Sequence, residues 1–146
     1  MIEKYVFGIF FAVPLCYASV KDMQTYLIPD RANLALLILG ALRIITKGLS
    51  PPDAILGMML CGIPFLMAAI ISDGVGGGDV KLFSCSGFFL GLNGAYFALI
   101  SSLILFLIFY MIFRLFKRRN RGDRIAFAPF ITFGSIFSYL IGVILN

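Results

Sequence analysis

The sequence predicts an all-α integral membrane protein with six transmembrane helices, the fourth of them short. Of its 146 residues, 61% are hydrophobic and only 13% are charged, and the mean hydropathy is +1.03. A soluble domain has far fewer apolar residues than this. The apolar residues also fall into runs, several of which approach the roughly twenty residues that cross a hydrocarbon core. The length suits one domain over residues 1–146.

The first three runs are short spans bounded by charged or helix-breaking residues. The first extends from Tyr5 to Val20, between two lysines whose side chains can reach the headgroups. The second, from Pro29 to Ile45, begins with a proline, which suits the first turn of a helix. The third covers Ala54 to Ile71, and Asp53 before it is expected to be the helix N-cap.

The next apolar stretch decides the number of spans, because residues 82–113 carry no charge. These 32 residues would form a straight helix of about 48 Å, which exceeds one crossing. Gly91-Leu-Asn-Gly94 is the expected break. It divides the stretch into a short helix from Val80 to Leu90 and a span from Ala95 to Phe113. The last span is expected from Ile125 to Leu145.

The basic residues predict the orientation, because cytoplasmic loops are enriched in lysine and arginine. With six spans, nine basic residues fall on one side and three on the other. The nine are Lys21, Arg31, Lys81, Arg114, Lys117, Arg118, Arg119, Arg121 and Arg124, and the three are Lys4, Arg43 and Lys47. We therefore expect an inner (cytoplasmic) membrane protein with both termini outside. The basic run from Arg114 to Arg124 suits a headgroup anchor better than a nucleic-acid site, and no nucleic-acid partner is expected.

The residues that are absent restrict the chemistry. The chain has no histidine, so it cannot supply a Ser-His or Cys-His nucleophile pair or a His-based zinc site. Its three cysteines, Cys16, Cys61 and Cys85, stand singly in apolar runs and are expected to be small hydrophobic residues. We expect no metal and no cofactor. Carboxylates are then the main candidates for acid-base chemistry.

Two of the acids are candidates for a functional role. Asp22 follows the first span and Asp79 begins the fourth, so the predicted topology places both on the cytoplasmic side. Asp30 suits the first turn of a helix and Asp73 a turn before Gly74, and neither needs a further role. Two carboxylates within hydrogen-bonding reach can share one proton, so that one activates a water molecule while the other polarises a carbonyl. This chemistry cleaves peptides without a metal.

The segments around these two acids resemble a known family. Gly76-Gly-Gly-Asp79-Val-Lys81-Leu is similar to the G-x-G-D-x-K-L motif of the prepilin peptidases, which are intramembrane aspartic proteases. Asp22-Met-Gln-Thr25-Tyr-Leu-Ile-Pro29-Asp is similar to the family's D-x-x-T-x-x-[IL]-P-[DN] segment. A third segment, Ala126-Phe-Ala-Pro-Phe130, resembles P-F-x-P-F with alanine in the place of the first proline.

The resemblance implies a function and a set of site residues. Asp22 and Asp79 would be the catalytic pair that removes the leader of a type IV prepilin or pseudopilin, after a glycine, at the cytoplasmic membrane face. The residues that would bind substrate or support the motifs are Gly76, Gly77, Gly78, Lys81, Thr25 and Pro29. For Lys81, contact with substrate and a headgroup anchor remain equal alternatives. Longer family members carry an N-terminal region with Cys-x-x-Cys motifs and also methylate the new N-terminus of the product. This chain has no Cys-x-x-Cys motif. It is therefore expected to cleave without methylation.

Two other functions compete with the peptidase. A small proton-coupled transporter or channel could use the aspartates as a proton relay, although the acids lie at helix ends and no inverted repeat is visible. A membrane scaffold could dock a partner through the basic run. The sequence leaves open the particular substrate, the oligomeric state and whether the aspartates meet without substrate.

Overall fold

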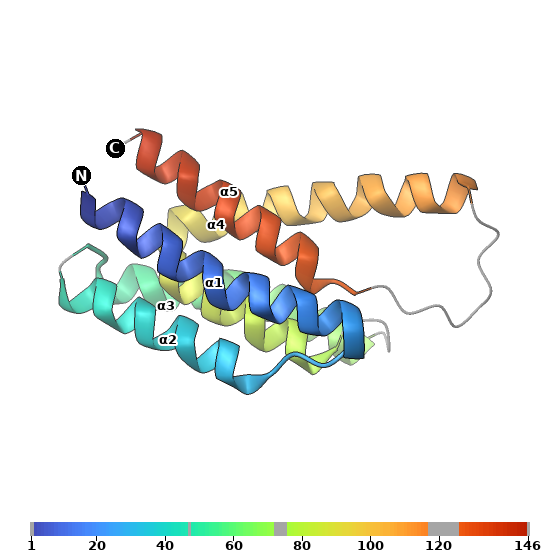
Figure 1. Ribbon diagram of the computed structural model, residues 1–146, viewed down its shortest axis with the longest axis horizontal. Helices are drawn as coiled ribbons and strands as arrows, with labels where there is room; N and C mark the ends of the chain where they lie inside the picture. Colours follow the sequence, from blue (N-terminus) through green and yellow to red (C-terminus); the bar gives the residue numbers. More distant parts are fainter. Residues whose placement is uncertain (1, 47, 72–75, 117–125, 146) are drawn as a thin grey trace.

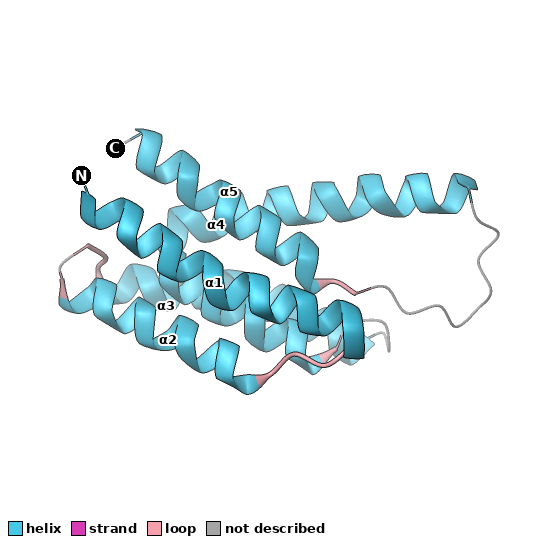
Figure 2. Cartoon of the chain, in the orientation of Figure 1, coloured by secondary structure: helices cyan, strands magenta, loops and turns pink. Residues whose placement is uncertain are grey.

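The computed structural model describes residues 2–46, 48–71, 76–116 and 126–145, and in these residues every regular element is a helix (Figure 2). The all-α prediction is therefore confirmed. The five helices are α1 (Ile2–Thr25), α2 (Asp30–Ile45), α3 (Pro51–Ile71), α4 (Gly77–Phe116) and α5 (Ala128–Leu145).

The predicted short fourth helix is part of α4, which bends at Gly91. This glycine has φ 75° and ψ 178°, a conformation that a residue with a side chain rarely adopts. Segment 77–90 runs away from one end of the bundle and segment 92–116 returns toward it (Figure 1). The predicted break is confirmed at Gly91, but the expected interruption as far as Gly94 is wrong, because only Gly91 leaves the helical conformation within α4.

Other helix starts also differ from the predictions. α3 begins at Pro51, and its N-cap is Ser50 rather than Asp53. The Ser50 hydroxyl accepts a hydrogen bond from the Asp53 backbone N–H at 3.3 Å and donates one to the Asp53 carboxylate at 2.6 Å. Serine thus caps the helix and the acid follows three residues later, the arrangement of a capping box. α5 begins at Ala128, and Ile125, where the last span was expected to start, lies outside the described residues.

The outer surface of the bundle is apolar, as a bilayer requires. Ile9, Ile70 and other large hydrophobic side chains are exposed, while polar side chains such as Ser86 and Ser135 are buried. Three described helices are long and apolar enough to cross a membrane, and they comprise Glu3–Thr25, Pro51–Ile71 and Gly77–Ile112. The chain is an integral membrane protein, although this criterion does not confirm the six predicted crossings.

Glycines bring α3 and α4 into backbone contact near the bend at Gly91. A Cβ atom on Gly57 would lie 2.5 Å from the Gly87 carbonyl oxygen and 2.7 Å from the Gly91 carbonyl carbon. A Cβ on Gly87 would in turn collide with the Gly57 carbonyl. Gly87 and Gly91 form a G-x-x-x-G spacing, which lets membrane helices approach closely. This contact fixes the position of segment 77–90, at whose start Asp79 lies.

Candidate active site

Asp22 lies in the last turn of α1, and its side chain is only 5% exposed. The Ala128 backbone N–H at the start of α5 donates a hydrogen bond of 3.1 Å to Asp22 Oδ2. The first N–H groups of a helix have no intrahelical partner and favour an anion, so the start of α5 is a suitable support for this carboxylate. The third sequence segment, which contains Ala128, thereby acquires a definite place in the site.

Asp79 lies in the first turn of α4, three residues after the N-cap position occupied by Gly76. Its Oδ2 accepts a hydrogen bond of 3.2 Å from the Gly76 backbone N–H, which is the acidic half of a capping box. The other oxygen, Oδ1, is buried and has no hydrogen-bond partner among the described residues. An unpaired buried carboxylate oxygen is costly, so this atom is the natural place for a water molecule or a substrate group.

The fold brings these two acids to the same end of the bundle, although 56 positions separate them in the numbering. α1 ends, and α4 and α5 begin, toward the end opposite the two termini (Figure 1). Gly78, next to Asp79, packs against Ile28, six residues after Asp22, so the two carboxylates belong to adjoining segments of the chain. Two such carboxylates can hold one proton between them.

The segment after Asp22 turns the chain toward α2. The Thr25 hydroxyl donates hydrogen bonds to the carbonyls of Lys21 at 2.9 Å and Leu27 at 3.5 Å. Tyr26 adopts a left-handed conformation with φ 53°, and Pro29 is the N-cap of α2. Thr25 and Pro29 thus shape the backbone beside the site.

The three glycines before Asp79 have different surroundings. A Cβ on Gly78 would lie 3.1 Å from Ile28 Cβ, so Gly78 allows the segment after Asp22 to pack against the start of α4. A Cβ on Gly76 would lie 3.3 Å from the Asp79 carboxylate. A Cβ on Gly77 would meet no atom within 4 Å. Gly77, where there is open space, is the variable "x" of the G-x-G-D pattern. Gly76 and Gly78, where a Cβ would be crowded, are the two fixed glycines of the pattern.

Valine at Gly78 should therefore reduce activity much more than valine at Gly77. The larger side chain would push Ile28 away and separate the segment after Asp22 from Asp79, and we expect a loss of about a hundredfold, since a displacement of about 1 Å can have this effect. The measurement is the rate of peptide cleavage by Gly78→Val, with Gly77→Val as the matched control. Equal rates for the two variants would contradict this interpretation.

Lys81 pairs with Asp30, the first residue of α2, at 3.2 Å between Nζ and Oδ1. Their side chains are 63% and 79% exposed, so the pair contributes roughly 0–1 kcal/mol to stability. Lys81 therefore links the starts of α2 and α4 beside the site. The sequence analysis did not predict this ion pair of Asp30. Contact between Lys81 and substrate stays a prediction.

Ala128→Pro isolates the hydrogen bond to Asp22. Proline removes the N–H donor but is well tolerated at the first position of a helix, where Ala128 lies, so α5 should still form. Loss of a hydrogen bond to a charged group typically costs about 1.5–3 kcal/mol, and we expect kcat to fall about tenfold or more.

The control for this variant is Ala126→Pro, which removes an N–H group two residues earlier and restores the proline of the family pattern. Steady-state cleavage kinetics of both variants check the prediction. An unchanged kcat in Ala128→Pro would show that the Asp22 contact is dispensable.

Two sequence features cannot be compared with the structure. Asp73 and most of the basic run, from Lys117 to Arg124, lie outside the described residues. Within the described part of the chain, no three Cys, Asp or Glu side chains gather as metal ligands do. We therefore assign no metal-binding residues.

Comparison with known proteins identifies the family of this chain. The model of the type IV leader peptidase family matches residues 9–115, which include both Asp22 and Asp79. The chain belongs to the type IV leader peptidase family. This membership confirms the resemblance inferred from the sequence motifs.

Two curated relatives of this chain carry the name prepilin leader peptidase/N-methyltransferase. The protein from Bacillus subtilis (strain 168) is 37% identical over 131 residues, covering 88% of this chain and 52% of the relative. The protein from Pectobacterium carotovorum subsp. carotovorum is 27% identical over 139 residues, covering 90% of this chain and 48% of the relative. The chain thus spans about half the length of these relatives. No solved structure matches it.

Proposed function

We propose that this protein is an intramembrane aspartic endopeptidase that removes the leader peptide of type IV prepilin-like or pseudopilin substrates. The observation that carries the proposal is that Asp22 and Asp79 lie at the same end of the bundle (Figure 1), where Asp79 Oδ1 is buried and has no hydrogen-bond partner among the described residues. Family membership supports leader peptides as the substrates. The relatives' names support the same chemistry.

In the proposed mechanism the two carboxylates share one proton. The ionised member takes a proton from a water molecule lying against Asp79 Oδ1, and the water oxygen attacks the scissile carbonyl carbon. The protonated member donates a hydrogen bond to the carbonyl oxygen as negative charge develops there. The C–N bond then breaks, and the departing amine receives the proton taken from water. The start of α5 holds Asp22 in position during these steps.

The substrate backbone would enter beside the glycines before Asp79. Gly77 has open space where a side chain would stand, so an extended peptide can approach the carboxylates from this side. The prepilin's apolar helix would remain in the bilayer while its leader reaches the site. We assign no oligomeric state.

We place the site at the cytoplasmic face of the inner membrane, with six crossings and both termini outside. Two features support this placement: the alternating directions of the helices, with α4 counted as two segments (Figure 1), and three described basic residues at the end that holds the aspartates, Lys21 near the end of α1, Arg31 at the start of α2 and Lys81 near the start of α4. The absence of methylation remains a prediction from the sequence.

The proposal is tested by reconstituting the purified protein in liposomes with a purified type IV prepilin and following leader release on a gel. N-terminal sequencing of the product identifies the bond that is cut. We expect cleavage directly after the glycine that ends the leader. A folded preparation that releases no leader, or that cuts elsewhere, would refute the assignment.

A further inference from the structure

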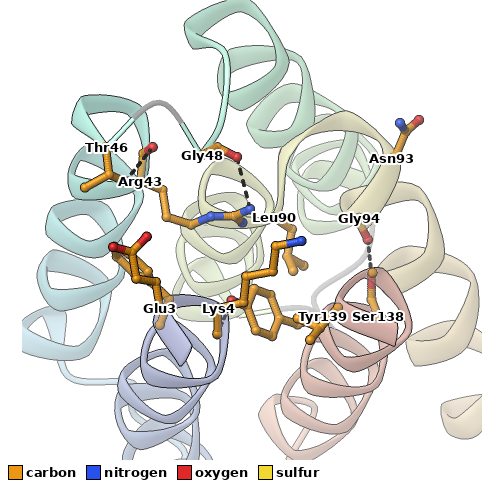
Figure 3. A pocket seen from close by; sticks show the side chains of 13 residues that line it. Glu3, Lys4, Arg43, Thr46, Gly48, Leu90, Asn93, Gly94, Ser138 and Tyr139 are labelled. Atoms are coloured by element: carbon orange, nitrogen blue, oxygen red, sulfur yellow. Dashed lines mark hydrogen bonds between the residues drawn. The ribbon is translucent and has the colours of Figure 1, made fainter. Parts of the chain in front are cut away.

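A polar pocket lies at the end of the bundle opposite the aspartates. It has a volume of about 600 Å³ and is formed by residues of α1, α2, α4 and α5 together with the α2–α3 connection. Glu3, Lys4, Arg43 and Tyr139 contribute polar groups to it (Figure 3). Phe7 and Val143 contribute apolar surface. The proposed peptidase mechanism uses none of these residues.

Arg43 is held rigidly at this pocket. Its guanidinium donates hydrogen bonds to the carbonyl oxygens of Phe89 at 2.6 Å and Gly48 at 3.4 Å. It also lies over the rings of Phe89 and Tyr139, with 4.9 Å and 5.6 Å to their centroids. These contacts use two of its N–H groups and fix the plane of the guanidinium, so its remaining N–H groups are oriented without further ordering cost.

Lys4 brings a second positive charge into the same space. The Tyr139 hydroxyl donates a hydrogen bond of 2.7 Å to the Lys4 carbonyl, which ties this part of α1 to α5. Glu3, Lys4 and Arg43 all line the pocket; in Figure 3 the Lys4 ammonium lies on the Leu90 side and the Glu3 carboxylate on the Thr46 side. Among the described residues neither cation forms an ion pair. The two cations outnumber the one acid, Glu3, among the residues that line this pocket, which favours an anion.

We propose that this pocket binds the phosphodiester of a phospholipid headgroup. A fixed guanidinium together with an ammonium suits phosphate oxygens, and the pocket lies at the helix ends, where headgroups are found. The apolar residues Phe7, Leu90 and Val143 in its wall provide surface for the first carbons of the acyl chains. A purely structural role explains why Arg43 contacts two carbonyls, but it does not explain a polar pocket of about 600 Å³ beside it.

The test is calorimetric titration of the detergent-solubilised protein with a short-chain phosphatidylglycerol, kept below its micelle concentration. We expect saturable binding that Lys4→Gln weakens about tenfold, as loss of one charge-assisted hydrogen bond predicts. Lys21→Gln is the matched control, because it removes the same charge from the other end of α1 and should leave the affinity unchanged. Thermal unfolding verifies that both variants are folded.

A parallel titration with inorganic phosphate separates the two sources of this chemical group. We expect phosphate alone to bind much more weakly than the lipid, because it lacks the apolar contacts. Equal affinity for the two ligands would overturn a lipid site, and unchanged lipid affinity in Lys4→Gln would overturn the pocket assignment. Leader release is not a readout in either titration, so the outcome does not depend on the peptidase proposal.

Discussion

Asp22→Asn and Asp79→Asn should each lower leader release by at least about a thousandfold. Asparagine preserves the size of the side chain but can neither accept the proton of the attacking water nor share a proton with its partner. The cap on α4 should be weakened only modestly, because the asparagine oxygen can still accept the hydrogen bond from the Gly76 N–H. The check is the cleavage rate of each purified variant in liposomes with a prepilin.

Asp30→Asn and Asp53→Asn are the controls for these variants. Both acids lie in the first turn of a helix, as Asp79 does, but Asp30 pairs with exposed Lys81 and Asp53 bonds to Ser50. We expect both controls to cleave within a few fold of the parent. Cleavage by Asp79→Asn at a control's rate would exclude the proposed mechanism.

Gly57→Val should destabilise the fold by about 3 kcal/mol, at the upper end of the usual cost of overpacking. The added side chain would meet the backbone of Gly87 and Gly91 rather than a movable side chain, so α3 and α4 must separate. Because this contact positions the segment that begins beside Asp79, activity should fall together with stability. Equilibrium unfolding in mixed micelles measures the change.

Gly142→Val provides the comparison, since a Cβ at Gly142 meets no atom within 4 Å. We expect its free energy of unfolding to lie within about 0.5 kcal/mol of the parent. If both variants unfolded with the parent's free energy, the close approach of α3 and α4 would not be a feature of the folded protein.

The presence of the helices could be predicted from the sequence. A long apolar segment inside a membrane must satisfy its own backbone hydrogen bonds, and an α-helix does so within the segment. The bend at Gly91 was predictable for the same reason, since 32 uncharged residues exceed one crossing. Its extent was not, because Asn93 and Gly94 are poor helix formers whose neighbours nevertheless keep them helical. The N-cap of α3 was misassigned to Asp53, although Ser50 followed by an acid three residues later is the signature of a capping box.

The site was only partly predictable. The positions of Asp22 and Asp79 followed from their motifs, whereas the contact from Ala128 depends on where α5 begins, which hydropathy alone does not determine. The backbone contact at Gly87 could have been found from the G-x-x-x-G spacing it forms with Gly91. The unpaired oxygen of Asp79 could not have been found from the sequence, because the burial of a single atom depends on the packing of several helices.

If Asp22 and Asp79 form one site, their side chains lie close together in the folded protein. Thiol cross-linking measures this proximity directly. The variant Asp22→Cys/Asp79→Cys would be made in a background lacking Cys16, Cys61 and Cys85 and treated in membranes with a short bifunctional methanethiosulfonate.

Asp30→Cys/Lys81→Cys, whose parent side chains are in contact, is the positive control for this reagent. Asp22→Cys/Asp53→Cys, which joins opposite ends of the bundle, is the negative control. We expect the Asp22/Asp79 pair to cross-link as readily as the positive control. A pair that cross-links no better than the negative control, while the positive control reacts fully, would contradict it.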